Sequence, residues 1–280
     1  MSSEASANVS GNGQLDYNPI DMLCIAAARE VHNDDAVLVG MGPPLLVCAL
    51  AKQIHAPGMT YVTESGPIDW VLDPEHQAPI QIAEAKLAEG AAMLGDMIDA
   101  LGVIVMGGRA TAAVLQSAQI DRLGNMNTMV IGDYTKFKRR LPGTGGHADS
   151  GASAGRVIST VPFESRRFRE RVDFRTTAGY IDGPGGRVNA GLNLQGPNVC
   201  VTTACIFTFD TPDGGETGSC EMTLDGLFPG VSVEDITSQI PWDLRVSDNV
   251  HAIPHPTTEE LEMLNLLDRN FVHRVPGRYR

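Results

Sequence analysis

Short apolar runs alternate with amphipathic segments along the first part of the chain. Apolar residues recur at helical spacing after Asn18, which is a suitable helix cap, and Pro19 suits the first turn. The unbroken apolar run Ala36–Val39 is typical of a strand buried on both faces. Leu45–Ala51 predicts a second helix, and Met59–Thr63 predicts a second strand. This alternation predicts βαβ units and a parallel sheet.

The same pattern continues to the end of the chain, with fewer clear helices after residue 121. We expect one more helix early on, at Gln81–Leu94. Further strands are expected at Val103–Met106, Ala112–Leu115, Thr128–Ile131, Arg156–Val161, Val199–Thr203 and Ile206–Phe209. Two late amphipathic segments are Val233–Gln239 and Thr257–Leu267. The predicted fold class is therefore α/β, with an open, mainly parallel sheet and flanking helices.

The domain organisation follows from composition. Residues 1–16 are rich in Ser, Asn and Gly, which predicts a disordered tail. No internal repeat or low-complexity linker divides the remainder, so residues 17–280 are predicted to form a single domain. The first residues lack a basic region and an apolar core, so no secretory signal is expected and the predicted location is cytoplasmic.

Charge and residue types exclude several classes of protein. The 34 acidic residues outnumber the 21 basic ones, and a net charge of −13 argues against nucleic acid as a partner. No run of about 20 apolar residues is present, so no membrane span is expected. The five cysteines lie mostly in apolar runs and the seven histidines are scattered, so we predict buried free thiols and no metal site.

Basic residues gather in one stretch of this acidic chain. Between Lys136 and Arg175, ten basic residues face four acidic ones, which gives this stretch a charge of +6. The ten are Lys136, Lys138, Arg139, Arg140, Arg156, Arg166, Arg167, Arg169, Arg171 and Arg175. The stretch is either a solvated face or subunit interface, or a site for an anionic cofactor.

Glu64 is the most informative single residue. It directly follows the predicted strand Met59–Thr63 and precedes Gly66, so it lies at the carboxyl end of a parallel strand. Ligands of open α/β sheets bind beyond these ends. A carboxylate there can act as a covalent nucleophile or simply as a cap or surface acid. The turn Gly40–Pro44, which is no dinucleotide fingerprint, can offer backbone N–H groups to an oxyanion or a phosphate.

Several Gly-rich segments are individually typical of turns, but together they form a family pattern. The segments are Val62–Gly66, Ala118–Asp121 with Gly124–Asn127, Ile131–Tyr134, Pro142–Gly146 and Tyr180–Arg187. In this order they resemble the beta subunits of family I CoA-transferases, of the glutaconate CoA-transferase type. The resemblance extends from about Asp21 to about Leu267 and implies the open α/β subunit fold of that family.

The resemblance also implies a function. Glu64 matches the catalytic glutamate of the family's E-S-G motif, which attacks an acyl-CoA thioester and becomes a glutamyl-CoA thioester in ping-pong transfer to a small carboxylic acid. The other site residues it suggests, for the oxyanion or CoA, are Gly40, Gly42, Ala118, Gln119, Gly145 and Gly146. Coenzyme A is then a substrate, with no tightly bound cofactor and no metal. An alpha-type subunit would complete a heterodimer or heterotetramer.

One departure from the family pattern keeps other interpretations open. Gln116 and Ser117 precede Ala118 where beta subunits often carry two glycines, which puts glutaconate specificity in question. A branch of the same fold lacks the glutamate and hydrolyses ring-derived acyl-CoA in steroid degradation, whereas Glu64 is retained here. The alternatives are an acyl-CoA hydrolase of this fold and a non-catalytic CoA-binding subunit.

Overall fold

A computed structural model describes residues 16–70, 79, 81, 83–192, 196–211 and 218–274. The tail expected over residues 1–16 lies outside this range except for Asp16. Within the described residues, the largest element is a ten-stranded sheet. Its strands, in spatial order, are β15 (Arg245–Ala252), β14 (Met222–Leu227), β13 (Cys205–Phe209), β12 (Pro197–Thr202), β10 (Val157–Val161), β5 (Ala112–Gln116), β1 (Ala36–Val39), β2 (Thr60–Val62), β3 (Pro67–Ile68) and β4 (Met93–Leu94).

The five central strands run parallel, in the order β12-β10-β5-β1-β2. At one edge β2, β3 and β4 pair antiparallel, and at the other β12, β13 and β14 do so before β15 pairs parallel. Because the chain passes from β1 to β2 on one side and later to β5 on the other, the order reverses beside β1. Such switch points open a crevice at the carboxyl ends of the strands, which is where doubly wound sheets bind ligands.

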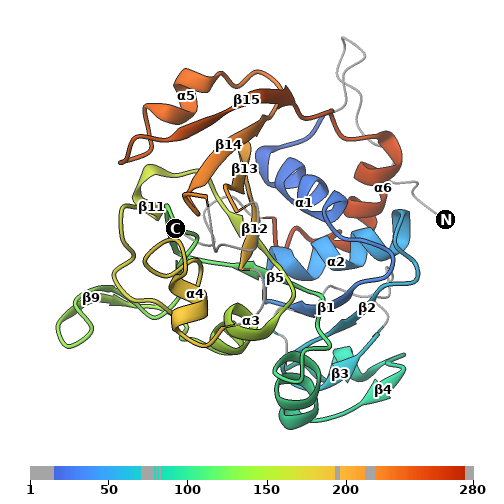
Figure 1. The fold of residues 1–280 in the computed structure, drawn as a ribbon. Coiled ribbons are helices and arrows are strands. Elements are labelled where there is room, and N and C mark those ends of the chain that lie inside the picture. Colours follow the sequence, from blue (N-terminus) through green and yellow to red (C-terminus); the bar gives the residue numbers. More distant parts are fainter. Residues whose placement is uncertain are drawn as a thin grey trace.

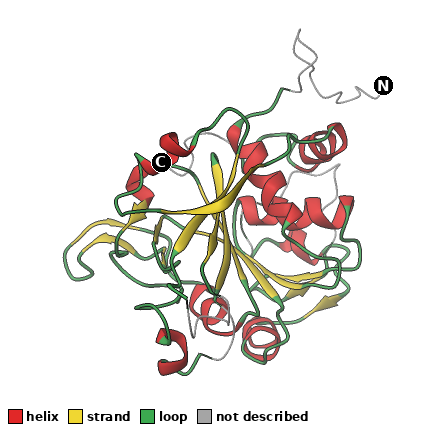
Figure 2. Cartoon of the chain, turned by 45° about the horizontal axis from the view of Figure 1, so that its top comes forward, coloured by secondary structure: helices red, strands yellow, loops and turns green. Residues whose placement is uncertain are grey.

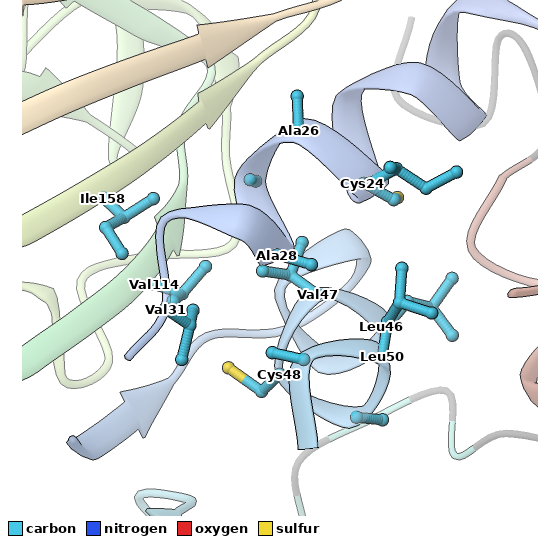
Figure 3. Close-up of a cluster of buried hydrophobic side chains, with 14 of the residues drawn as sticks. Cys24, Ala26, Ala28, Val31, Leu46, Val47, Cys48, Leu50, Val114 and Ile158 are labelled. Carbon is cyan, nitrogen blue, oxygen red and sulfur yellow. The ribbon is translucent and has the colours of Figure 1, made fainter. Parts of the chain in front are cut away.

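Three helices cover one face of the sheet: α1 (Pro19–Arg29), α2 (Pro43–Ile54) and α6 (Thr258–Leu267). In Figure 1 they lie together at the upper right. Figure 3 shows part of this core, to which α1 contributes Cys24, Ala26 and Ala28, α2 contributes Leu46, Val47, Cys48 and Leu50, and the sheet contributes Val114 and Ile158. The apolar stripes of the three helices thus form one core with the sheet.

Smaller elements cover the opposite face, as Figure 2 shows. They include the strands β6 (Gln119–Asp121), β7 (Met126–Asn127), β8 (Val130–Gly132), β9 (Phe137–Arg140) and β11 (Phe168–Arg169). The 3₁₀ turn η1 (Ala85–Ala88) packs into the first core through Leu87. The helices of the opposite side are the π-helix η2 (Ile98–Val105), α3 (His147–Ser153), α4 (Gly186–Asn189) and α5 (Val233–Thr237), with the 3₁₀ turn η3 (Ser165–Arg167). They enclose a second apolar cluster.

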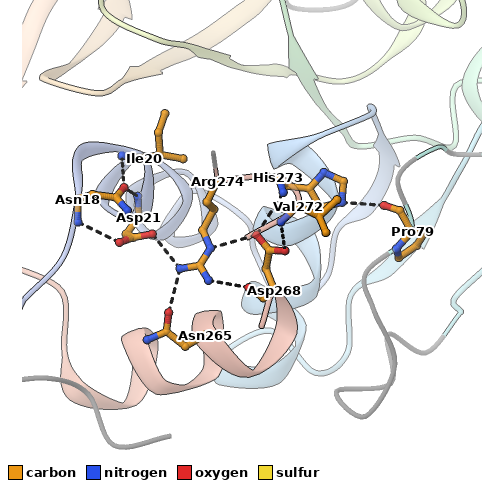
Figure 4. Close-up of polar contacts among 9 residues, drawn as sticks. All are labelled: Asn18, Ile20, Asp21, Pro79, Asn265, Asp268, Val272, His273 and Arg274. Carbon is orange, nitrogen blue, oxygen red and sulfur yellow. Dashed lines mark hydrogen bonds and ion pairs between the residues drawn. The ribbon is translucent and has the colours of Figure 1, made fainter. Parts of the chain in front are cut away.

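The last described segment of the chain is tied to the first helix. Arg274 is buried and donates to Asp21 of α1 at 2.8 Å, to Asn265 at 3.0 Å and to Asp268 at 3.2 Å (Figure 4). Asp21 also closes the capping box of α1, because its carboxylate accepts from the Asn18 N–H. One cation therefore joins the start of the first helix to the segment that follows the last.

Most of the predicted central elements are confirmed. The strands expected at Ala36–Val39, Ala112–Leu115 and Arg156–Val161 form β1, β5 and β10, and the first and last helices begin after Asn18 and Thr257 as caps. The α/β class with an open, largely parallel sheet is confirmed as well. The expected strand Thr128–Ile131 is displaced to β8.

Two predictions in the segment 81–106 are wrong. The strand expected at Val103–Met106 is the end of the π-helix η2, because a short apolar run fits a helix as well as a strand. The helix expected at Gln81–Leu94 is reduced to the 3₁₀ turn η1, with residue 82 outside the described range. Gly90 has φ +66 and ends any helical path, after which Met93–Leu94 form β4.

The cysteines behave as predicted, since Cys24, Cys48, Cys200, Cys205 and Cys220 are all buried and free. Burial raises the pKa of the Cys200 thiol to about 12, so that thiol stays protonated at neutral pH. In the part of the chain that the structure describes, no helix has the length and apolar character needed to cross a bilayer.

Candidate active site

Glu64 lies at the tip of the hairpin between β2 and β3, beyond the carboxyl end of β2. A tight turn holds it there, because the Gly66 N–H donates to the Thr63 carbonyl at 3.1 Å and the Thr63 N–H donates to Pro67 at 3.3 Å. The hydroxyls of Thr63 and Ser65 lie 3.0 Å apart across the turn. The Glu64 side chain is half-buried at this edge of the sheet.

Gly66 is required at this turn for two reasons. Its φ is +111, a backbone conformation that side chains disfavour. A Cβ atom here would also lie 2.1 Å from the carbonyl oxygen of Gly95, whose N–H donates to the Gly66 carbonyl at 3.2 Å. This contact fastens the Glu64 turn to the segment that leads into the π-helix η2.

The loop before α3 supplies the partner of the Glu64 carboxylate. The Gly146 N–H donates to Glu64 Oε2 at 2.6 Å across 82 residues of sequence. A Cβ on Gly145 would lie 2.9 Å from the same oxygen, and one on Gly146 would lie 3.1 Å from it and 3.0 Å from Leu101 of η2. The two glycines thus let backbone approach the carboxylate, and Oε1 accepts no hydrogen bond from the described residues.

His147 anchors this loop immediately after Gly146. Its Nδ1 lies 2.8 Å from the Thr177 hydroxyl. Burial lowers the pKa of His147 to about 4, so the imidazole is neutral near pH 7. The Ser150 hydroxyl, one turn along α3, donates to the Gly146 carbonyl at 2.6 Å. Both backbone polar groups of Gly146 are therefore held, its N–H by Glu64 and its carbonyl by Ser150 of α3.

The structure brings Glu64, Gly145 and Gly146 together, and it places the other predicted residues at neighbouring strand ends. Gly40 follows β1 and its N–H donates to the Val114 carbonyl at 2.8 Å. Gly42 precedes α2 with φ +87, and its N–H has no hydrogen-bond partner among the described residues. Of these two turn glycines, only Gly42 keeps a donor for an incoming oxyanion.

Ala118 and Gln119 are engaged inside the fold. The Ala118 N–H donates to the Asn127 carbonyl at 3.1 Å. The buried Gln119 amide donates to Asp173 at 2.9 Å and accepts from Asn127 at 2.6 Å. Asp173 also accepts from the Gly132 N–H at 2.9 Å. Gln119 therefore holds the base of the β8–β9 hairpin in position, and its amide is engaged there and not at Glu64.

The basic stretch divides into two groups. Five of its arginines form salt bridges with carboxylates, namely Arg156 with Asp35, Arg166 and Arg167 with Glu164, and Arg171 and Arg175 with Asp182. Lys136, Lys138, Arg140 and Arg169 form none of the salt bridges of the described residues and are exposed, and the first three lie on one hairpin. The charge that remains available to an anion is thus concentrated on the β8–β9 hairpin.

Arg156 in particular is a structural residue. It joins the amino-terminal ends of β10 and β1 through two hydrogen bonds to Asp35, at 2.7 and 2.8 Å. Glu64 lies beyond the other, carboxyl ends of the parallel strands. Burial opposes ionisation of Asp35, but the hydrogen bonds from Arg156, the His32 N–H and Thr111 prevail and hold the pKa of Asp35 at about 2.

No group of three or more His, Cys, Asp or Glu side chains in the described ranges is arranged to bind a metal ion. A surface hollow lined by residues that include Thr208, Asp210 and Arg245 lies over β13 to β15 and does not include Glu64. The candidate catalytic residue Glu64 and its glycine partners therefore lie at the carboxyl ends of the strands, away from that hollow.

The fold and the site together define an open α/β protein with a positioned carboxylate at its ligand-binding edge. The sequence model of Coenzyme A transferase matches residues 20–239, and the chain belongs to this family. Members of the family use CoA esters as substrates.

Relatives agree with this assignment over nearly the whole chain. The chain is 34% identical over 252 residues to the B subunit of 3-oxoadipate CoA-transferase from Pseudomonas knackmussii, covering 90% of this chain and 94% of the relative. It is 31% identical over 251 residues to the B subunit of glutaconate CoA-transferase from Acidaminococcus fermentans, covering 88% and 91%. The crystal structure of glutaconate coenzyme A-transferase from Acidaminococcus fermentans superposes with a TM-score of 0.83 at 27% identity, covering 93% of this chain and 99% of that one.

Sequence reasoning missed the residues that hold the site without being part of it. His147, Thr177 and Asp173 were not singled out, since each makes its contact across 30 or more residues. The π-helix residue Leu101 was expected to lie just before a strand and instead lies against Gly146. No local pattern announces such contacts, because they depend on which loops the sheet brings together.

Proposed function

We propose that this chain is the glutamate-bearing subunit of a CoA-transferase that moves CoA between an acyl-CoA and a small carboxylic acid. The observation that carries the proposal is the Glu64 carboxylate at the end of β2, with Oε2 held by the Gly146 N–H and Oε1 accepting no hydrogen bond from the described residues. A carboxylate oxygen with a free lone pair at a ligand-binding edge is suited to covalent catalysis.

The first half-reaction proceeds in two steps. Glu64 Oε1 attacks the acyl carbon of the donor thioester, the C–S bond breaks, and CoA leaves as a thiolate while an acyl-glutamyl anhydride forms. The thiolate then attacks the Glu64 carboxyl carbon, the anhydride C–O bond breaks, and the donor acid leaves as a carboxylate. Glu64 now carries CoA as a glutamyl thioester, and the acceptor carboxylate reverses both steps.

The hydrogen bond from Gly146 supports the second step. When the thiolate attacks the Glu64 carboxyl carbon, negative charge develops on Oε2, which the Gly146 N–H already faces at 2.6 Å. A donor fixed in advance at this oxygen lowers the barrier without reorganisation. The Gly42 N–H, at the end of the neighbouring strand β1, is the proposed donor for the oxyanion of the first step.

A partner subunit is expected to complete the site. The relatives are named as B subunits, which supports an A subunit as partner. Beside the Glu64 turn, a group of apolar side chains between 47% and 72% exposed covers β4 and η2. We call it the 93–106 surface: Met93, Leu94, Met97, Ile98, Val103 and Met106. Apolar surface of this kind marks a protein interface.

The names of the two relatives suggest the class of acyl group to test first. The two relatives are named after 3-oxoadipate and glutaconate, which are both dicarboxylic acids. We therefore propose dicarboxylic acyl-CoA donors as the first substrates to test, with acetate-sized acids as the comparison.

The decisive experiment detects the covalent intermediate. The two-subunit complex is incubated with acyl-CoA and then reduced with borohydride, which converts a glutamyl thioester to an alcohol. Mass spectrometry should find the change only in the peptide that contains Glu64, and only when acyl-CoA is present. The variant Glu89→Gln, at an exposed glutamate of the same chain, is the matched control.

Two outcomes would contradict the proposal. Full transfer by the Glu64→Ala variant would show that another group carries CoA, as in a non-catalytic CoA-binding subunit. Release of acid and CoA that does not depend on an acceptor carboxylate would identify an acyl-CoA hydrolase.

A further inference from the structure

The β8–β9 hairpin is the element that concentrates unneutralised positive charge in this acidic chain. Lys136, Lys138 and Arg140 are exposed and form no salt bridge with the described carboxylates, whereas the acid on the hairpin, Asp133, is exposed and turned to Thr135. In a molecule with net charge −13, a local positive element attracts anions selectively. Figure 1 shows this hairpin projecting from the body at the lower left.

The hairpin carries aromatic surface beside the charge. The register shifts between Ile131 and Gly132, so that Phe137 pairs with Gly132 while Arg139 pairs with Ile131. This bulge at Lys138 breaks the alternation of the strand and brings Arg140 toward Phe137, with the guanidinium 5.9 Å from the ring centroid. Phe137 is 46% exposed. An arginine beside an accessible ring suits a ligand that combines phosphate with a base.

A second ring lies at the tip of the hairpin. Tyr134 is 52% exposed and stacks on Phe174, with ring centroids 5.1 Å apart and planes 27° apart. Phe174 neighbours Asp173, which accepts from the Gly132 N–H at the hairpin base. The hairpin therefore has a fixed base and a supported tip, although it projects from the body.

The hairpin is continuous with the loop that reaches Glu64. The Leu141 N–H donates to Met129 and the Gly143 N–H donates to Thr128, which extends the pairing of the two strands toward Gly146. Five residues lie between Arg140 and Gly146, and the six steps of chain that join them span at most about 20 Å. The phosphopantetheine arm of CoA has a similar reach when extended.

We infer that the β8–β9 hairpin binds the 3′-phosphoadenosine diphosphate end of CoA. Arg140 and Lys138 contact its phosphates, and Phe137 and Tyr134 provide the surface for adenine. The inference rests on the proposed function, since it supplies the nucleotide subsite of the same substrate whose thioester meets Glu64. The inference gives these hairpin residues a binding role, whereas Arg156 and the other salt-bridged arginines of the basic stretch have a structural one.

Binding of the isolated nucleotide tests the hairpin directly. Calorimetry with adenosine 3′,5′-bisphosphate should show an affinity for the full chain that falls at least about tenfold in Arg140→Gln and further in Lys138→Gln/Arg140→Gln, because each lost contact is charge-assisted. Arg269→Gln is the matched control, since Arg269 is exposed beyond α6 and its loss should leave the affinity unchanged. Equal affinity in all four proteins would overturn the inference.

A truncated substrate tests the same residues during turnover. In the two-subunit complex, the double variant should raise KM at least about tenfold for acyl-CoA and leave it unchanged for the corresponding acyl-pantetheine, which lacks the nucleotide. Equal losses with both substrates would overturn the inference. The two proposals can fail separately. A complex that binds the nucleotide through the hairpin but has no transfer activity would support the subsite and refute the transferase proposal.

Discussion

Around Glu64, small residues determine the geometry of the carboxylate. Gly66 allows the turn to meet Gly95, and Gly145 and Gly146 allow the loop before α3 to meet the carboxylate. These motifs were visible in the sequence as Pro142–Gly146 and Val62–Gly66, but their contact with each other was not. Sequence reasoning found the participants because turns need glycine. It could not find the hydrogen bond, since that depends on the packing of segments 82 residues apart.

The substitution Gly146→Ala tests the space beside Glu64. Gly146 has φ −74, which any residue can adopt, so the added Cβ acts through contact alone. It would lie 3.1 Å from Glu64 Oε2 and should displace the carboxylate by a few tenths of an ångström. We expect kcat to fall by about 10²-fold with an unchanged far-UV circular dichroism spectrum. The control Arg269→Gln, at an exposed residue beyond α6, should keep full activity.

The neutral His147 predicts a pH dependence of stability. Its pKa is about 4 in the folded chain and about 6.5 in the unfolded chain, so the unfolded chain binds the extra proton between these values. The stabilisation that neutral His147 contributes to the folded chain is complete above pH 6.5 and is lost as the pH falls toward 4.

Urea unfolding of wild type and His147→Gln at about pH 7 and pH 5 measures this effect. Glutamine retains a partner for Thr177 and does not titrate, so the stability difference between the two proteins should shift in favour of the variant by about 1 kcal/mol at pH 5, after allowance for partial exposure. Parallel pH profiles would show that His147 is not the titrating group.

At the scale of elements, local pattern predicted those whose burial is uniform. The central strands β1, β5 and β10 are mostly apolar and buried along almost their whole length, and they were placed within a residue or two. The edge strand β15 was missed because it is polar and mostly exposed. The strand β14 was also missed, although its residues Met222–Leu227 alternate between buried and half-buried, a period-two signal that was available.

The π-helix η2 and β4 give a prediction about assembly. Replacing Met97 and Ile98, which are 62% and 72% exposed, by serine removes apolar area from the 93–106 surface and should weaken association with the A subunit at least about tenfold. Analytical ultracentrifugation of the mixed subunits measures the change. Val188→Ser removes a similarly exposed apolar residue from α4 and should leave association unaffected. Unaltered association of the double variant would place the interface elsewhere.

At the scale of the whole molecule, a single buried cation joins the two ends of the described chain. Arg274 lies among Asp21, Asp268 and Asn265, and the first of these is separated from the other two by most of the length of the chain. Nothing in the sequence singles out Arg274, because its partners are ordinary residues of α1, of α6 and of the segment after α6. The α/β class of the fold was predictable from the alternation of apolar runs and amphipathic segments. The link that Arg274 makes between the first helix and the end of the described chain was not.

Removal of this cation should destabilise the fold as a whole. Arg274→Met leaves two buried carboxylates without their partner, which costs about 3–5 kcal/mol. Chemical denaturation should show this loss as a lower midpoint with an unchanged slope. The exposed Arg269→Gln should change stability by less than about 0.5 kcal/mol. A similar effect of both variants would refute a specific role for the Arg274 network.

The hydrogen bond between Gly146 and Glu64 lies within one chain, and this has a consequence for assembly. The proposed nucleophile is oriented by its own polypeptide before any partner arrives, so the partner needs to contribute only the walls around the acyl group. Pairing this chain with the A subunit of a different relative should therefore exchange the acids that are accepted while the site of covalent attachment stays the same. In such a system, selectivity evolves on one gene product and reactivity is preserved on the other.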